Sequence, residues 1–297
     1  MQDRIKKISK NLKSKFYFDY DTSKNVWFNA GGKALVYCLV YDEGELTKIL
    51  SNIGDIPYEI IGAGSNILIR DNGFNGILFK LGKGFNNITL HESVIEVGAS
   101  ILDVNLAKYT RNKDIDNFEF LSGIPGSIGG AIKMNAGCYG SEIRDILKEI
   151  KIINPYGKLQ YLSKDEIDLS YRNSNIPLGS IIISANFFYS YGKTEEIINR
   201  TKKILKMREN SQPLKFKTSG STFKNPKNYF AAELIENAGC KGLNVGDAFV
   251  SNKHANFIIN TNKATATHIE ELGKRIVDRV YNKFKINLEW EIKIIGK

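Results

Sequence analysis

Residues 121–131 read Leu-Ser-Gly-Ile-Pro-Gly-Ser-Ile-Gly-Gly-Ala, and residues 134–140 continue with Met-Asn-Ala-Gly-Cys-Tyr-Gly. Glycine occupies six of these eighteen positions, so much of this backbone has no Cβ atom to keep another group away. Consecutive backbone N–H groups in such turns form a concavity that suits phosphate. The interleaved Ile124, Ile128 and Met134 favour burial, which a plain linker does not need. The stretch indicates a surface that binds an anionic ligand, with a tight structural turn as the alternative.

A second glycine cluster, Gly62-Ala63-Gly64-Ser65-Asn66, lies between two short apolar runs. Residues 58–61 predict a strand, and residues 67–70 predict another strand directly after the glycines. The dinucleotide-binding fingerprint requires a helix at that place, so the order strand, loop, strand excludes it. Phosphate is then expected to be held by loop amides together with Ser65 and Asn66.

Length and composition describe an ordinary globular protein. A chain of 297 residues suits about two domains. Hydrophobic residues make up 42% and charged residues 25%, which permits a sizeable core. No apolar run approaches the roughly 20 residues that span a bilayer, and the N-terminus has no apolar segment typical of a signal peptide. We expect a soluble, cytoplasmic protein without membrane contact.

Cysteine, histidine and charge narrow the class of function. The dispersed cysteines and histidines favour neither a disulfide framework nor a metal centre, so no metal is predicted: Cys38, Cys138, Cys240, His91, His254 and His268. The net charge of +10 comes from scattered lysines rather than from a basic arm. This favours an enzyme that attracts phosphate-bearing ligands over a nucleic-acid-binding protein, which stays the alternative.

The remaining secondary structure follows from the spacing of apolar residues. Helices are expected over residues 4–15, 42–50, 100–112, 194–209, 231–238 and 265–284. Further strands are expected over residues 35–40, 149–154, 159–161, 181–183 and 285–295. Ser100 is the expected N-cap of its helix, and alternation in the last strand places Glu289 and Glu291 on one face. A domain boundary is expected near residues 191–193.

Six motifs in this order resemble the UDP-N-acetylenolpyruvoylglucosamine reductase family, and the resemblance covers nearly the whole chain. The motifs are residues 62–66, 123–130, 135–137, Tyr171-Arg172-Asn173-Ser174, residues 220–226 and Leu288-Glu289-Trp290-Glu291. The compact spacing between Arg172 and Ser221 resembles the short form of the family, which lacks an inserted loop with a substrate-binding tyrosine. Residues 25–32 depart from the family, where many members have a Thr-Phe-Arg-like run before two glycines.

The resemblance implies a fold class of α+β type. It comprises an FAD-binding fold of the vanillyl-alcohol-oxidase (PCMH) type, with two α+β subdomains, and a C-terminal α+β substrate-binding domain. The implied division is residues 1–82 and 83–192 for the two FAD-binding subdomains and residues 193–297 for the substrate-binding domain. The implied enzyme is a monomer that binds small molecules only, with no nucleic acid or membrane partner.

The implied reaction is the reduction of UDP-N-acetylglucosamine enolpyruvate to UDP-N-acetylmuramate in peptidoglycan precursor synthesis. NADPH is the reductant, and FAD is the bound cofactor. The FAD is expected to be noncovalent, because no histidine or cysteine lies in the early loops where covalently flavinylated relatives of the fold attach it. Another FAD enzyme of this fold, oxidising a hydroxy acid or an alcohol, is a further alternative.

Three residues match the catalytic positions of the family: Arg172, Ser221 and Glu291. Hydride addition to the enolpyruvyl group leaves negative charge, delocalised into the carboxylate, that needs fixed positive groups and a proton donor. Arg172 is expected to bind the carboxylate and Ser221 to donate the proton. Glu291 is expected to polarise the intermediate or, if it is protonated, to form a hydrogen bond with it. From the residues alone, Arg172 also fits an exposed surface position and a serine beside glycine also fits a turn.

The resemblance also implies binding residues. The pyrophosphate of FAD is expected at Gly62, Gly64, Ser65 and Asn66. The flavin and its chain are expected at Gly123, Ile124, Gly126, Ser127, Gly129, Gly130, Asn135 and Gly137. Lys224 and Asn225 are expected to bind the UDP part of the substrate.

Overall fold

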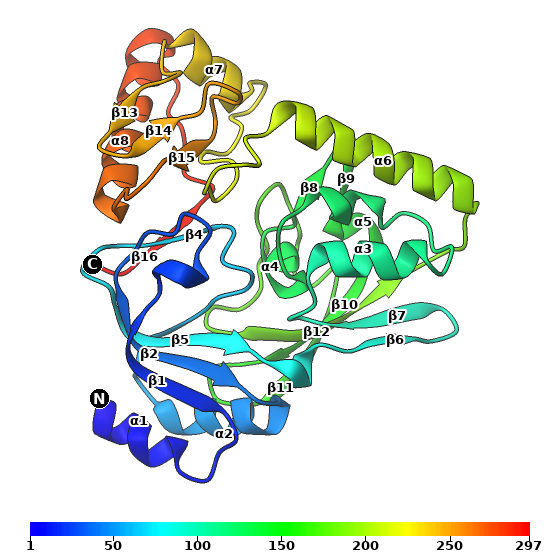
Figure 1. Cartoon of the computed structure of the whole chain (residues 1–297). Helices are drawn as coiled ribbons and strands as arrows, with labels where there is room; N and C mark the ends of the chain where they lie inside the picture. The colour runs from blue at the N-terminus through cyan, green and yellow to red at the C-terminus, as the bar shows by residue number, and fades with distance from the viewer. The chain divides into compact units, whose positions relative to one another are not determined.

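The computed structural model describes all 297 residues, which form two compact units. Unit 1 comprises Met1–Asp19, Leu35–Ala63 and Gly76–Met207. Unit 2 comprises Tyr20–Ala34, Gly64–Asn75 and Arg208–Lys297. Both units therefore combine segments that are distant in the sequence (Figure 1).

The first sheet of unit 1 has the strand order β1-β2-β5-β3. Its strands are β1 (Lys15–Asp21), β2 (Lys33–Val40), β3 (Tyr58–Ile60) and β5 (Phe74–Leu81), and β3 runs parallel to β5. Two helices, α1 (Gln2–Ser9) and α2 (Glu43–Ile53), pack together against this part of the unit (Figure 1). The carboxylate of Asp42 accepts a hydrogen bond from Glu45 N (2.9 Å) and so begins α2 as a capping residue.

The second sheet of unit 1 is antiparallel and has the order β11-β10-β12-β7-β6. Its strands are β6 (Ile88–Leu90), β7 (Val94–Gly98), β10 (Leu147–Ile153), β11 (Leu159–Ser163) and β12 (Ile181–Phe188). The remaining elements are η2 (Lys83–Phe85), α3 (Asp103–Arg111), η3 (Glu119–Gly123), α4 (Ile128–Lys133), β8 (Gly137–Cys138), β9 (Ser141–Glu142), α5 (Ile143–Ile146) and α6 (Thr194–Ser211). One hydrophobic core joins both sheets, with Val36 and Phe79 from the first and Ile150 and Phe187 from the second.

Unit 2 has its own hydrophobic core around a long helix, α8 (Ala266–Phe284). A small antiparallel sheet, β13-β14-β15, and helix α7 (Ala231–Asn237) pack on this core. The sheet strands are β13 (Asn244–Val245), β14 (Ala248–Val250) and β15 (Ile258–Asn260). A second pair of strands is parallel: β4 (Ile67–Ile69) lies beside β16 (Lys293–Ile295). The strand that follows the second glycine cluster therefore pairs with the last strand of the chain.

Several predicted elements are confirmed, and three need correction. The helix expected over residues 4–15 ends at Ser9, because Lys10 is extended and Asn11 has a positive φ of 64°. Ser100 does not cap α3, whose N-cap is Leu102; instead the Ser100 hydroxyl donates to Phe85 O (2.8 Å). The strand expected over residues 285–295 is regular only in β16.

The division into two units differs in kind from the predicted three domains. The chain passes into unit 2 after Met207, inside α6, and unit 2 also takes two short segments from the first third of the chain. Compactness does not separate the two FAD-binding subdomains, since one core joins both sheets of unit 1. The boundaries at residues 82 and 192 remain a prediction.

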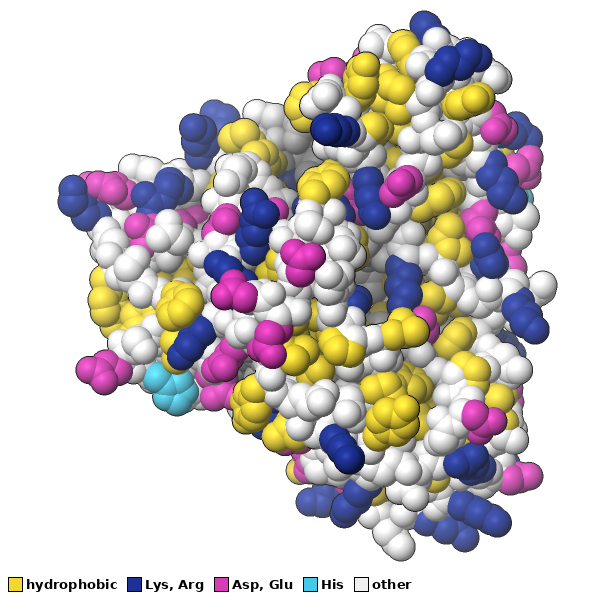
Figure 2. Space-filling model, turned by 180° about the vertical axis from the view of Figure 1, so that it is seen from behind, with side chains coloured by type: hydrophobic (Ala, Val, Ile, Leu, Met, Phe, Trp, Pro, Cys, Tyr) yellow, Lys and Arg dark blue, Asp and Glu magenta, His cyan; other side chains and the backbone are white.

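The surface carries both signs of charge. On the face drawn in Figure 2, lysine and arginine side chains are mixed with acidic ones and do not form a continuous basic stripe. None of the helices combines the length and the apolar character needed to span a lipid bilayer.

Candidate active site

The first glycine-rich stretch runs from η3 into α4 and packs against the start of α3. Asp103 N donates to Gly126 O (3.1 Å), and Gly129 N donates to Ala99 O (3.0 Å). The amide of Gly129 therefore bonds within the protein, as does that of Ile128, which donates to Ile101 O (2.9 Å). The Asp103 side chain is fully buried, and neither carboxyl oxygen has a hydrogen-bond partner. Burial raises the pKa of Asp103 well above its ordinary value, because an ionised carboxylate without partners is unfavourable inside the protein.

Two residues predicted to bind the cofactor, Gly62 and Ser127, lie side by side in unit 1. A Cβ atom at Gly62 would lie 2.5 Å from Ser127 Oγ, so no other residue fits without displacing the serine. The Ser127 side chain does not cap α4, although Ser127 occupies the N-cap position. Beside it, a Cβ atom at Gly130 would meet only Ser127 Oγ, at 3.7 Å, and otherwise open space.

Arg172 is distant from the glycine-rich stretch in the sequence but contacts its last part in space. Its Nη2 donates to Gly137 O (3.2 Å), and its guanidinium lies over the Tyr171 ring, 5.0 Å from the centroid. Asn135, which is fully buried, donates through Nδ2 to Ser170 O (3.1 Å). Asn135 therefore holds the turn that carries Arg172. Arg172 itself has a positive φ of 54°, an uncommon conformation for a residue with a side chain.

The second glycine cluster contributes Gly64, Ser65 and Asn66 to unit 2, whereas Gly62 belongs to unit 1. Gly64 has a positive φ of 74° and packs against the backbone carbonyl of Asn25, which only glycine permits. Asn66 Nδ2 donates to Glu291 O (3.1 Å), and Asn66 O accepts from Lys293 N (3.2 Å). The Asn66 residue predicted at the pyrophosphate therefore also holds the C-terminal segment.

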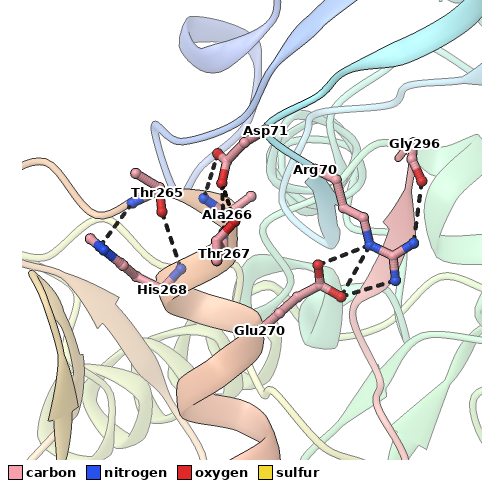
Figure 3. Close-up of polar contacts among 8 residues, drawn as sticks. All are labelled: Arg70, Asp71, Thr265, Ala266, Thr267, His268, Glu270 and Gly296. Carbon is pink, nitrogen blue, oxygen red and sulfur yellow. Dashed lines mark hydrogen bonds and ion pairs between the residues drawn. The ribbon is translucent and has the colours of Figure 1, made fainter.

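Directly after β4, two charged residues anchor helix α8 (Figure 3). Asp71 accepts from Ala266 N (2.9 Å) and Thr267 N (2.8 Å) at the first turn of the helix. Burial alone would raise the pKa of Asp71, but these hydrogen bonds and that of the Thr267 hydroxyl lower it below its ordinary value. Arg70 Nε lies 2.9 Å from Glu270 Oε2 on the next turn. Segments 200 residues apart are thereby joined.

The structure brings the segment of Ser221 to the segment of Glu291 within unit 2. Glu291 N donates to Thr222 O (2.9 Å), and Phe223 forms an antiparallel bridge with Trp290. Their rings also contact, with centroids 5.0 Å apart. Ser221 follows Gly220, whose positive φ of 78° and open surroundings leave space beside the serine. Two of the three predicted catalytic residues thus come from neighbouring backbones.

Asn256 fixes this arrangement from the other side, and the sequence did not single it out. The side chain is buried, with its Oδ1 accepting from Phe223 N (2.9 Å) and its Nδ2 donating to Phe223 O (2.8 Å). Thr222 N also donates to Asn256 O (2.8 Å). A buried amide that satisfies both backbone groups of one residue holds that residue rigidly. An asparagine in an apolar run was the only available signal.

The predicted substrate residues have protein partners. Lys224 Nζ lies 3.5 Å from Glu289 Oε2, and Asn225 Oδ1 accepts from Ala231 N (2.9 Å) at the start of α7. The Glu289 side chain is 77% exposed, so this glutamate is largely solvated. In unit 1, a Cβ atom at Gly123 would lie 2.8 Å from Cys138 Sγ, so this predicted flavin residue is closely packed.

The sequence of both units is similar to that of known proteins. Residues 212–295 match the family model described as the C-terminal domain of UDP-N-acetylenolpyruvoylglucosamine reductase, and residues 34–163 match an FAD binding domain. Among named reductases of this kind, that of Wolbachia sp. subsp. Drosophila simulans (strain wRi) is 42% identical, over 95% of this chain and 96% of its own length. The Rickettsia akari (strain Hartford) reductase is 41% identical over 98% of this chain and 99% of its own.

The chain belongs to the UDP-N-acetylenolpyruvoylglucosamine reductase family. A crystal structure of the reductase from Thermus caldophilus covers 96% of this chain and 100% of its own, with 30% identity and a TM-score of 0.84. Membership of the reductase family, with an FAD-binding α+β fold and a C-terminal domain of its own type, is therefore confirmed.

FAD, which the reductase family uses, fits the residues described above. Gly62 and Ser127 form a close contact that a larger side chain would destroy, and Gly130 faces open space. Backbone amides, a hydroxyl group and glycine Cα atoms are the groups expected around a pyrophosphate and a flavin ring. The convergence of Arg172 with Ser221 and Glu291 stays a prediction, because Arg172 belongs to unit 1 and the other two to unit 2.

Proposed function

We propose that the protein reduces UDP-N-acetylglucosamine enolpyruvate to UDP-N-acetylmuramate with NADPH as the reductant. The reaction belongs to cytoplasmic peptidoglycan precursor synthesis, and the protein acts as a monomer. Family membership supports the reaction and its cofactor, noncovalent FAD. The observation that carries the assignment of roles is the hydrogen bond from Glu291 N to Thr222 O, which sets Ser221 beside the C-terminal segment.

Bound FAD would supply the hydride chemistry that connects NADPH with the terminal carbon of the enolpyruvyl group. The protein then has to stabilise the charge that develops on the substrate. Arg172 binds the substrate carboxylate, because a planar and permanently charged guanidinium matches its two oxygens. The hydrogen bond to Gly137 O and the contact with Tyr171 support this role, since they hold the guanidinium in one orientation.

Ser221 donates a proton to the carbon next to the new C–H bond. A serine hydroxyl is a weak acid, but the enediolate formed there is basic enough to take its proton when the geometry is fixed. Glu291 acts at the same place by polarising this intermediate. Lys224 and Asn225 bind the uridine diphosphate, where a lysine provides positive charge for phosphate. The pair Lys224–Glu289 is exposed enough to open for a phosphate ligand.

The absorption spectrum of the purified protein tests this function. We expect a yellow protein whose flavin bands bleach under anaerobic NADPH and return on addition of the enolpyruvyl sugar nucleotide. Bleaching by a hydroxy acid or an alcohol, without NADPH, would instead indicate an oxidase of the same fold. A colourless protein with salt-dependent affinity for DNA or RNA would indicate the nucleic-acid alternative.

A further inference from the structure

Lys80, on strand β5, is a partly buried lysine without a carboxylate partner. Its Nζ donates to the backbone oxygen of Gly62, and it forms no ion pair. Burial lowers the pKa of the Lys80 ammonium, and no charged neighbour offsets this effect. An ammonium group removed from water normally pairs with an anion. In its ammonium form, the Lys80 side chain therefore has a positive charge that no acidic side chain of the protein neutralises.

Lys151 shows the usual arrangement in the same unit. It also projects from a strand, β10, but its Nζ lies 2.7 Å from Glu43 Oε2. Burial alone would lower the pKa of Lys151, but the hydrogen bond and the charge of Glu43 raise it. The comparison indicates that the missing partner of Lys80 is a ligand rather than another side chain.

The surroundings of Lys80 indicate the chemistry of that ligand. Gly62, which accepts its hydrogen bond, packs directly against Ser127 Oγ, and that hydroxyl does not cap α4. An ammonium group has three N–H donors, so two remain after the bond to Gly62. A cation, a hydroxyl group and a glycine backbone together form a donor set for phosphate oxygens.

We propose that Lys80 binds the pyrophosphate of FAD, at the corner that it forms with Gly62 and Ser127. The inference rests on the proposed function, since FAD is the ligand. Lys80 supplies the positive charge that the glycine cluster lacks, because residues 62–66 contain no basic side chain and lead into a strand rather than a helix.

Flavin titration of the full-length protein, after reversible removal of its flavin, tests this role. Quenching of flavin fluorescence gives the affinities for FAD and for riboflavin, which has no phosphate. We expect Lys80→Met to weaken FAD binding about ten- to a hundredfold, the range for a charge-assisted hydrogen bond. Riboflavin affinity should stay unchanged, and Lys80→Arg should retain most of the FAD affinity. Lys151→Met, the matched control, should leave both affinities unchanged.

The outcomes separate the possible failures. Equal FAD affinity in Lys80→Met and the wild type would overturn the role of Lys80. Equal weakening for FAD and riboflavin, or a lower Tm of the flavin-free variant, would also overturn it and indicate a structural lysine. The expected Tm is equal or higher, because the variant removes an unpaired, partly buried charge. A wild-type protein that binds no FAD would overturn the proposed function itself.

Discussion

Ser219 and Ser221 are two residues apart, but their surroundings differ. The Ser219 hydroxyl is buried and has no hydrogen-bond partner, whereas Ser221 is partly exposed beside the open space at Gly220. A buried hydroxyl without a partner neither stabilises the fold nor reaches a substrate. The structure therefore separates the serine that fits a proton donor from its neighbour.

We expect Ser221→Ala to leave the bleaching of the flavin by NADPH unchanged and to slow reoxidation by the substrate by orders of magnitude. Loss of a positioned proton donor typically costs about 10²–10⁴-fold in rate. Rapid-mixing absorbance measures the two half-reactions separately. Ser219→Ala is the control and should match the wild type in both. Normal reoxidation in Ser221→Ala would show that another group donates the proton.

Asp103 predicts an unusual dependence of stability on pH. The pKa of Asp103 is raised in the folded state, so folding favours the protonated form. Its contribution to stability is fully present below the ordinary carboxyl pKa of about 4 and is lost as the pH rises towards the folded pKa. Asp103→Asn cannot ionise, so its free energy of unfolding relative to the wild type should improve as the pH rises from about 4 to 8. Urea unfolding across this range measures the difference, and a constant difference contradicts the prediction.

At the scale of the element, α8 begins where Asp71 accepts its first backbone N–H groups. The first four backbone N–H groups of a helix have no acceptor within the helix. A negative charge near them is also stabilised by the positive end of the helix dipole. Asp71 therefore couples β4, which follows the glycine cluster, to the longest helix of unit 2.

Thr265 is the N-cap of α8, and Asp71 adds acceptors for the next two backbone N–H groups. We expect Asp71→Ala to lower the free energy of unfolding by about 1–2 kcal/mol at pH 7, a cost similar to that of losing a side-chain acceptor at a helix start. Since the pKa of Asp71 is lowered in the folded state, this stability is present above the ordinary carboxyl pKa and disappears as the pH falls through the folded value. Urea unfolding of the wild type and the variant at pH 7 and at about pH 3 measures the loss of stability and its dependence on pH. Asp278→Ala, at an exposed position of the same helix, is the control. A loss of the same size at both pH values would refute the role of the charge.

At the scale of the whole molecule, the net charge of +10 acts on the encounter with phosphate-bearing ligands. We expect KM for both NADPH and the sugar nucleotide to rise when salt increases from about 50 to 500 mM, because screening shortens the range of the attraction. The rate at saturating substrate should change much less. Steady-state kinetics in chloride salts measure both quantities, and an unchanged KM would exclude electrostatic attraction.

The sequence by itself determined the family, the order of most helices and strands, and the segments where glycine allows tight turns. It did so because glycine clusters and apolar periodicity are local signals. The strands before and after residues 62–66, the strands over residues 149–154 and 159–161, and the long helix α8 all follow from neighbouring residues. The prediction was wrong where a residue bonds to a distant segment instead of its sequence neighbours. Ser100 was expected to cap its helix, but its hydroxyl donates to Phe85 O.

Only the tertiary structure decided which distant residues meet. Asn256 bonds both backbone groups of Phe223, Asn66 holds the segment of Glu291, and Lys80 reaches the carbonyl oxygen of Gly62. No spacing in the sequence predicts these contacts, because each joins segments brought together by the packing of a core. Burial also depends on that packing, and it is burial that lowers the pKa of Lys80 and raises the pKa of Asp103.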